Sequence, residues 1–297
     1  MRCMGENRQR RWGRGIRAGV CWLIVGVAAA QAPVVQVPAA QAPVVPADHY
    51  GPPVCGVEKA PARRMTAEAA KAEQLLGARN SQALLADEPL ENFGIERFRL
   101  ADYADCVGDG GCYWADLDAQ YKRAEKALAM RVAAERAGSG EKLAVVMDID
   151  ETALSGYCEM QREDFGYVGP MFNSWVVSPE AAIAIPGALR LFKEAKAAGA
   201  AVFFITGRPG LGAPMDQTAA TEKNLEAAGF VGWRGLSLRK DEENRMATIA
   251  YKSEERRRIV AQGYRIVMSV GDQWSDLLGD PQAGVSVKLP NPFYFLP

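Results

Sequence analysis

From residue 143 onward, short apolar segments alternate with longer helix-forming stretches, and this pattern constrains the fold more than any other feature. The segments expected to be strands are 143–148, 201–206, 235–239, 264–270 and 284–289. Between them, helices are expected at 187–198, 216–228 and 250–262. Continuous apolar strands separated by helices are typical of a parallel sheet with helices on both faces. The sequence therefore predicts an α/β, Rossmann-like core.

The region before this core has a different composition. Residues 60–87 and 112–138 are rich in alanine and other good helix formers. In the second stretch, apolar residues fall near helical spacing, at Leu117, Tyr121, Leu128 and Val132. We interpret this stripe as core packing and not as a cofactor site. The expected organisation is a small helical subdomain at 59–140, followed by the α/β core at 141–297.

The first thirty residues have the features of an export signal. An arginine-rich segment, 2–17, precedes a 13-residue apolar run, 18–30, that ends in small residues. About 20 apolar residues are needed to cross a bilayer, so we expect cleavage after Ala30 and no stable membrane insertion afterwards; an uncleaved anchor is the alternative. Cys21 follows Ala-Gly-Val, a poor lipoprotein box, so lipid anchoring is not expected. The predicted location is secreted or periplasmic.

A tether and four cysteines follow the expected signal peptide. Residues 31–58 are rich in proline and alanine, contain QAPVV twice, and read as an extended linker. Cys55, Cys106, Cys112 and Cys158 are an even set, which favours disulfides in an exported protein and allows three pairings. A glycine-rich loop between Cys106 and Cys112 favours a local bridge there, with four free thiols as the alternative.

Composition excludes several kinds of chemistry. The chain has a single histidine, which excludes Ser-His-Asp triads, histidine-rich zinc sites and histidine-nucleophile phosphatases. With 35 Lys+Arg against 36 Asp+Glu, there is no strong basic field, so no nucleic acid polymer is expected as a partner. The chemistry must therefore use carboxylates, lysine, hydroxyls or a metal held by oxygen.

Residues of those types occur where the predicted strands end. Ligands of open parallel sheets bind outside the carboxyl ends of the strands, so these residues are expected to converge. They are Asp148 and Asp150 after the first strand, Thr206 and Gly207 at the second, Lys252 in a helix, and Asp272 and Asp276 after the fourth.

This set of residues suits phosphoryl transfer. Clustered carboxylates stay ionised only beside a cation, and ligands that are all oxygen favour a hard ion such as Mg²⁺. A carboxylate can attack phosphorus and form an aspartyl-phosphate. Lysine and a metal can then stabilise the charge of the transition state.

Four segments resemble the haloacid dehalogenase superfamily and, within it, the secreted acid phosphatases of subfamily IIIB. They are VVMDIDETALS (145–155), FFITGRP (203–209), YKSEERRRIVAQGY (251–264) and SVGDQWSDLLG (269–279). The resemblance spans roughly residues 60–297. Within the subfamily, the chain is similar to the plant vegetative-storage-protein-like and the bacterial class C acid phosphatases. It implies a haloacid dehalogenase-like catalytic core.

The resemblance also implies catalytic and substrate-binding roles. Asp148 would be the nucleophile, and Asp150 would protonate the leaving oxygen and then activate water. Thr206 and the Gly207 amide would hold the phosphoryl oxygens, and Lys252 would bridge phosphate and nucleophile.

The same resemblance implies the metal ligands. Asp148 and Asp272 would ligate Mg²⁺ directly, Asp150 would contribute its backbone carbonyl, and Asp276 would give support through water.

These features predict a Mg²⁺-dependent acid phosphatase that acts through an aspartyl-phosphate on small phosphate monoesters, with broad specificity that includes nucleoside monophosphates. Two alternatives are a phosphotransferase that uses the same intermediate and a non-catalytic exported binding or storage protein. Nothing in the sequence assigns an oligomeric state.

Two further groups of residues have less specific interpretations. The aromatic residues after the nucleophile either stack on leaving groups or pack the core; they are Tyr157, Phe165, Tyr167, Phe172 and Trp175. Arg256, Arg257 and Arg258 are expected to form the exposed side of their helix.

Overall fold

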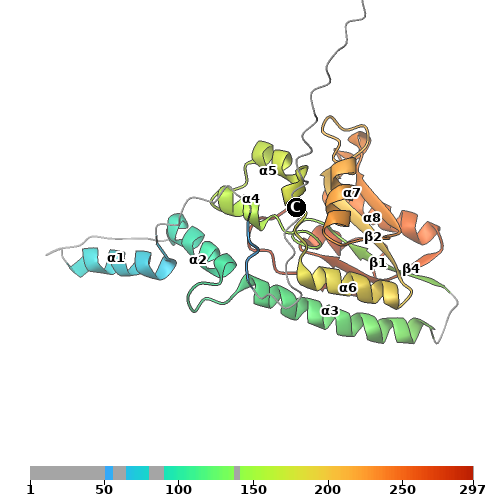
Figure 1. Ribbon diagram of the computed structural model, residues 1–297, viewed down its shortest axis with the longest axis horizontal. Helices are drawn as coiled ribbons and strands as arrows, with labels where there is room; N and C mark the ends of the chain where they lie inside the picture. The colour runs from blue at the N-terminus through green and yellow to red at the C-terminus, as the bar shows by residue number, and fades with distance from the viewer. Residues whose placement is uncertain (1–50, 56–64, 80–89, 137–140, 297) are drawn as a thin grey trace, which may run out of the picture. The chain divides into compact units, whose positions relative to one another are not determined.

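A computed structural model describes residues 51–55, 65–79, 90–136 and 141–296 and contains a five-stranded sheet (Figure 1). The strands are β1 (Lys142–Met147), β2 (Ala201–Pro209), β3 (Gly235–Arg239), β4 (Tyr264–Gly271) and β5 (Val285–Lys288). Their order across the sheet is β3-β2-β1-β4-β5, and every neighbouring pair is parallel. The predicted α/β fold is confirmed, with β1 at the centre of the sheet.

Both faces of the sheet are buried, which explains why the strands are apolar without alternation. Successive side chains of a strand point to opposite faces. Val145 and Met147 accordingly belong to the larger core cluster, whereas Ala144 and Val146 belong to a second cluster on the other face.

Helices cover each of these faces. The helices of the core are α3 (Tyr113–Arg136), α4 (Tyr157–Arg162), α5 (Gly169–Val176), α6 (Pro186–Ala197), α7 (Thr218–Ala227) and α8 (Thr248–Ala261). Short 3-10 helices are η1 (Pro179–Ala181), η2 (Asp241–Glu243) and η3 (Trp274–Asp276). Apolar residues of α3 and α6 join the larger cluster, while Tyr251 and Ile259 of α8 join the second. Since Figure 1 also shows α3 running beside α6, the two form one layer.

The predicted apolar stripe of α3 is confirmed. Leu117, Tyr121, Leu128 and Val132 are all buried in the larger core cluster. This long helix therefore shares a core with the sheet, while the domain boundary at residue 140 stays a prediction.

The helices before α3 differ in part from the expectation. The prediction of helix at 60–87 is met at α1 (Ala67–Arg79), and its ends lie outside the described residues. A further helix, α2 (Phe93–Asp105), was not predicted. Its N-terminus is capped by Asn92, whose side chain accepts a hydrogen bond from the Gly94 amide.

Two disulfides tie this region together. Cys106–Cys112 is formed as expected, and Cys55 is bonded to Cys158 in α4. The alternative of four free thiols is therefore wrong. The predicted signal peptide and nearly all of the predicted linker lie outside the described residues. Within the described part, no helix has the length and apolar character needed to cross a membrane.

Candidate active site

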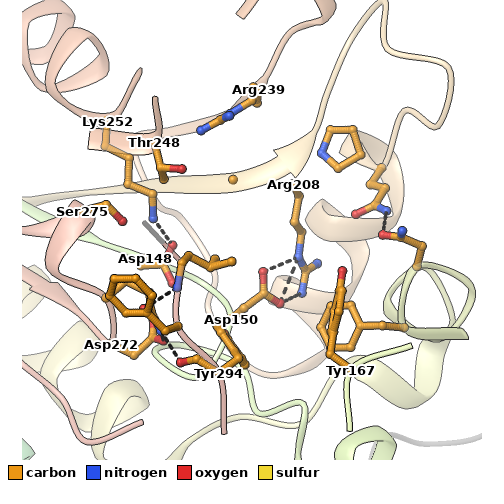
Figure 2. A pocket seen from close by; sticks show the side chains of 18 residues that line it. Asp148, Asp150, Tyr167, Arg208, Arg239, Thr248, Lys252, Asp272, Ser275 and Tyr294 are labelled. Carbon is orange, nitrogen blue, oxygen red and sulfur yellow. Dashed lines mark hydrogen bonds and ion pairs between the residues drawn. The ribbon is translucent and has the colours of Figure 1, made fainter. Parts of the chain in front are cut away.

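The carboxyl edge of the sheet holds a cavity of about 530 Å³ (Figure 2). Five of the predicted site residues line it: Asp148, Asp150, Gly207, Lys252 and Asp272. The other two, Thr206 and Asp276, are buried and contact residues of this lining. The structure thus brings together all seven residues that the sequence singled out.

Lys252 joins two of the acids. It lies in the second turn of α8, because that helix begins at Thr248, earlier than expected. Its buried Nζ lies 2.5 Å from Asp148 Oδ1 and also forms an ion pair with Asp276. Burial alone would lower the pKa of Lys252, but the two carboxylates raise it above its usual value. Lys252 is therefore a fixed positive charge beside the predicted nucleophile.

The surroundings of Asp148, unlike those of Lys252, disfavour its charged form. Burial raises its pKa well above the usual range, and the neighbouring carboxylates add to this, while Lys252 acts against it. Burial likewise raises the pKa of Asp272, with Asp276 as the next cause. One lysine is therefore not enough positive charge for three buried acids, and the site favours a further cation.

The three acids have the geometry of a metal site. Asp148, Asp272 and Asp276 each offer an oxygen, and these oxygens lie within 4.8 Å of one another. All three residues are buried, and a donor set made only of carboxylate oxygens suits a hard cation such as Mg²⁺. The residues present therefore fit the metal that the sequence predicts. The side chain of Asp150 is outside this group.

Neighbouring amides hold these acids in place. Asp272 Oδ2 accepts hydrogen bonds from Gln273 Nε2 at 2.7 Å and from Asn291 Nδ2 at 2.6 Å. The backbone amide of Gln273 donates to Asp276 Oδ2 at 2.8 Å. Sequence reasoning missed Asn291, although it follows β5 at the same edge of the sheet, and its position after a strand was the available signal.

Asp150 has a separate partner. Arg208 donates to its carboxylate through two nitrogens, with Nε 3.0 Å from Oδ2 and Nη2 2.7 Å from Oδ1. Arg208 is buried and also donates from Nη1 to Thr221 Oγ1 at 3.1 Å. Arg208 stands in the FFITGRP segment, but its role was not predicted from the sequence. The two aspartates of the Asp-x-Asp pair thus face different cations, Asp148 a lysine and Asp150 an arginine.

The end of β2 positions the other predicted phosphate ligands. The pairing of β2 with β3 is irregular between Ile205 and Pro209. Thr206 Oγ1 accepts a hydrogen bond from the Arg208 amide at 3.2 Å. At Gly207, a Cβ would meet no atom within 4 Å, so its backbone faces open space in the cavity.

The end of the chain forms one wall of the cavity. Tyr294, Phe295 and Leu296 line it, and the Leu296 amide donates to Gln273 Oε1 at 3.1 Å. Tyr294 donates from its hydroxyl to the buried Glu151 at 3.2 Å. This wall was not predicted, because a segment without strand or helix pattern gives no local signal.

One expectation about the arginine run is wrong. Arg257 and Arg258 are exposed, but Arg256 is only 1% exposed. It lies one helical turn after Lys252 on α8 and donates to the carbonyl oxygens of Asp276 and Pro281, each at 2.9 Å, and to that of Leu278. The buried guanidinium of Arg256 finds its hydrogen-bond acceptors in a loop that the local sequence does not reveal.

The aromatic residues after Asp148 divide between the two interpretations. Tyr167 and Phe172 line the cavity, with ring centroids 5.5 Å apart. Tyr157 and Trp175 are buried in the core, and Phe165 stacks on Phe293. Only the first two residues are in position to contact a ligand.

A parallel sheet whose carboxyl edge gathers an Asp-x-Asp pair, a buried lysine and a further acidic pair is typical of the haloacid dehalogenase-like fold. The family model of the haloacid dehalogenase superfamily, subfamily IIIB (acid phosphatase), matches residues 65–297. The chain belongs to this family, which confirms the resemblance drawn from its motifs.

Similar proteins include both enzymes and storage proteins. Acid phosphatase 1 of Solanum lycopersicum is 37% identical over 154 residues, which is 51% of this chain and 58% of that protein. Vegetative storage protein 1 of Arabidopsis thaliana is 32% identical over 155 residues, covering 51% and 55%. The chain thus matches somewhat more than half the length of these relatives. The solved class C acid phosphatase of Bacillus anthracis is 25% identical, covers 60% of this chain and 79% of that one, and has a TM-score of 0.48.

Proposed function

We propose that this protein is a Mg²⁺-dependent acid phosphatase that hydrolyses small phosphate monoesters through an aspartyl-phosphate. The observation that carries the proposal is the contrast between the two aspartates that follow β1. Asp148 contacts Lys252 and belongs to the acidic cluster, whereas Asp150 is held apart by Arg208. One acid placed for attack and another placed for proton transfer is what a two-step phosphatase requires.

In the first step, an Asp148 oxygen attacks phosphorus while the bond from phosphorus to the leaving oxygen breaks. Asp150 gives its proton to that oxygen, and the alcohol departs. In the second step, Asp150 takes a proton from water as the water oxygen attacks phosphorus. The bond between Asp148 and phosphorus then breaks and inorganic phosphate is released.

The remaining residues stabilise charge and orientation. Lys252 and the Gly207 amide offset the negative charge on the phosphoryl oxygens, and Thr206 supports the same end of β2. Arg208 orients the Asp150 carboxylate. Mg²⁺, when held by Asp148, Asp272, Asp276 and the Asp150 carbonyl, supplies positive charge that offsets the clustered carboxylates and the phosphate.

Two features bear on substrate and location. Tyr167 and Phe172 line the cavity and could stack on an aryl group or a nucleobase, which supports activity on nucleoside monophosphates.

The two disulfides support a secreted or periplasmic location, since disulfides persist in oxidising compartments.

The test is phosphate release from nitrophenyl phosphate and adenosine monophosphate at pH 5–7, with Mg²⁺ and then with EDTA. Asp148→Asn should abolish turnover. Asp150→Asn should reduce hydrolysis of alkyl esters more than that of nitrophenyl phosphate, because the nitrophenolate leaves without a proton. Turnover by Asp148→Asn near the wild-type level would refute the mechanism.

The same assay separates the alternatives. Adding glycerol or a nucleoside as acceptor would divert phosphate into a new ester if the protein is a phosphotransferase. If folded, Mg²⁺-loaded protein releases no phosphate from either substrate, the storage or binding role would be favoured, which the names of some relatives suggest.

A further inference from the structure

The mechanism leaves one cation of the cavity unused. Three basic side chains line the cavity, Arg208, Arg239 and Lys252. Lys252 is paired with two carboxylates, and Arg208 is paired with one. Among the residues that the structure describes, no carboxylate forms an ion pair with Arg239. Its charge is therefore free to meet an anion that enters the cavity.

The Arg239 side chain is held in position by other contacts. Nη1 donates to the Met246 carbonyl at 3.2 Å, and the guanidinium carbon lies 5.0 Å from the centre of the Tyr251 ring. Nε is buried and has no hydrogen-bond partner in the described part of the chain. A guanidinium fixed by stacking and one carbonyl keeps donors for a further acceptor and loses little entropy on binding.

The place of Arg239 in the sheet sets its distance from the reaction. Arg239 ends β3 and is in register with Pro209 of β2. The strand β2 in turn pairs with β1. Neighbouring strands are about 4.8 Å apart, so the backbones of β3 and β1 are separated laterally by about 10 Å. Leu236 is the β3 residue level with the end of β1, and Arg239 lies three residues beyond it, which adds to its separation from Asp148. Arg239 and Thr248 line the same cavity as Asp148 (Figure 2). At this separation, an anion at Arg239 can be a second group of the substrate, apart from the phosphate at Asp148.

We propose that Arg239 is a specificity determinant that binds a second anionic group of the substrate, a carboxylate or a second phosphate, distant from the phosphate that is cleaved. This inference rests on the proposed phosphatase function and narrows it to phosphate monoesters of acidic molecules. Arginine suits either anion because its planar donors match both in a bidentate manner.

The experiment compares substrates that differ only in the distant charge. One pair is 6-phosphogluconate and sorbitol 6-phosphate, which differ by a carboxylate in place of a hydroxymethyl group. A shorter pair is 3-phosphoglycerate and glycerol 3-phosphate, and a bisphosphate pair is adenosine 3′,5′-bisphosphate and adenosine 5′-monophosphate. The measured quantity is the ratio of kcat/KM within each pair for the wild type, Arg239→Gln and Arg239→Lys.

The wild type should prefer the doubly anionic member of at least one pair, and Arg239→Gln should reduce that ratio by about 10- to 100-fold. Arg239→Lys should retain part of the preference. The matched control is Arg245→Gln, which removes the same charge from an exposed residue outside the cavity lining and should leave the ratio unchanged. No preference in any pair, or equal losses on both members, would overturn the inference.

A binding measurement keeps the inference separate from the phosphatase proposal. The affinities of the same compounds are measured by calorimetry in an Asp148→Asn background, where the proposed nucleophile is absent. If no variant turns over any substrate, the phosphatase proposal fails, yet a charge-dependent affinity lost with Arg239→Gln would still support the anion site. Equal affinities within every pair would refute it.

Discussion

Replacing Arg256 with methionine should destabilise the protein strongly, because this buried arginine holds the loop that carries the acidic pair. Its guanidinium donates to three backbone carbonyls, two of them at 2.9 Å, and to Ser253 Oγ at 3.1 Å. Methionine preserves much of the side-chain length but leaves those carbonyls without a donor. At about 1–1.5 kcal/mol for each carbonyl bond, the loss in unfolding free energy is about 3–5 kcal/mol.

The matched control is the next residue of the same helix. Arg257 is exposed and pairs with Glu254 on the surface, so Arg257→Met should change stability by less than about 1 kcal/mol. Urea denaturation measures the two free energies, and thermal melts should show a shift of about 6–20 °C for Arg256→Met alone. Equal stability of the two variants would refute the view that Arg256 anchors the loop.

A second readout separates loop position from global stability. The loop bonded to Arg256 follows Asp272 and includes the carbonyl of Asp276. Arg256→Lys keeps the charge but presents one compact donor group, which cannot reach all three carbonyls. At a temperature where this variant is folded, it should need more Mg²⁺ for half-maximal activity than the wild type does. An unchanged Mg²⁺ requirement would show that the loop keeps its position without the guanidinium.

Three further predictions follow from the geometry. Replacing Cys55 and Cys158 by serine should destabilise the protein by about 5 kcal/mol, and replacing Cys106 and Cys112 by about 2 kcal/mol, because the closed loops differ in length; equal melting shifts would contradict this. Mg²⁺ at 100 times its dissociation constant should stabilise the fold by about 2.7 kcal/mol, so a melting temperature unaffected by EDTA and Mg²⁺ would argue against the acidic cluster as a metal site. Gly271→Ala should abolish activity and lower stability, since a Cβ there would overlap the aspartate of η3, and normal turnover would contradict it.

Much of the core was predictable because strands and helices leave periodic signals in the sequence. The predicted strand ends lie within three residues of the observed ones, and the predicted site residues lie together because parallel strands place their carboxyl ends at one edge. The helix α2 was not predicted because its mixed composition gives no clear stripe of apolar residues at helical spacing. It is stabilised by an N-cap and by packing against neighbouring helices.

Side-chain partners far apart in the chain were not predictable. Asp150 pairs with Arg208 across 58 positions, and Asn291 reaches Asp272 across 19. Such contacts depend on where complete elements pack. Residue type and local spacing do not fix this.

The sequence by itself determined the α/β class, the family and the seven residues of the predicted site, because these depend on hydrophobic periodicity and on motifs that are contiguous in the chain. Only the tertiary structure decided which of three adjacent arginines is buried, which aromatic rings face the cavity, and that no carboxylate of the described residues pairs with Arg239. Helical neighbours such as Arg256 and Arg257 have the same local propensity. Their environments differ because a loop from another part of the chain packs over one and leaves the other in water.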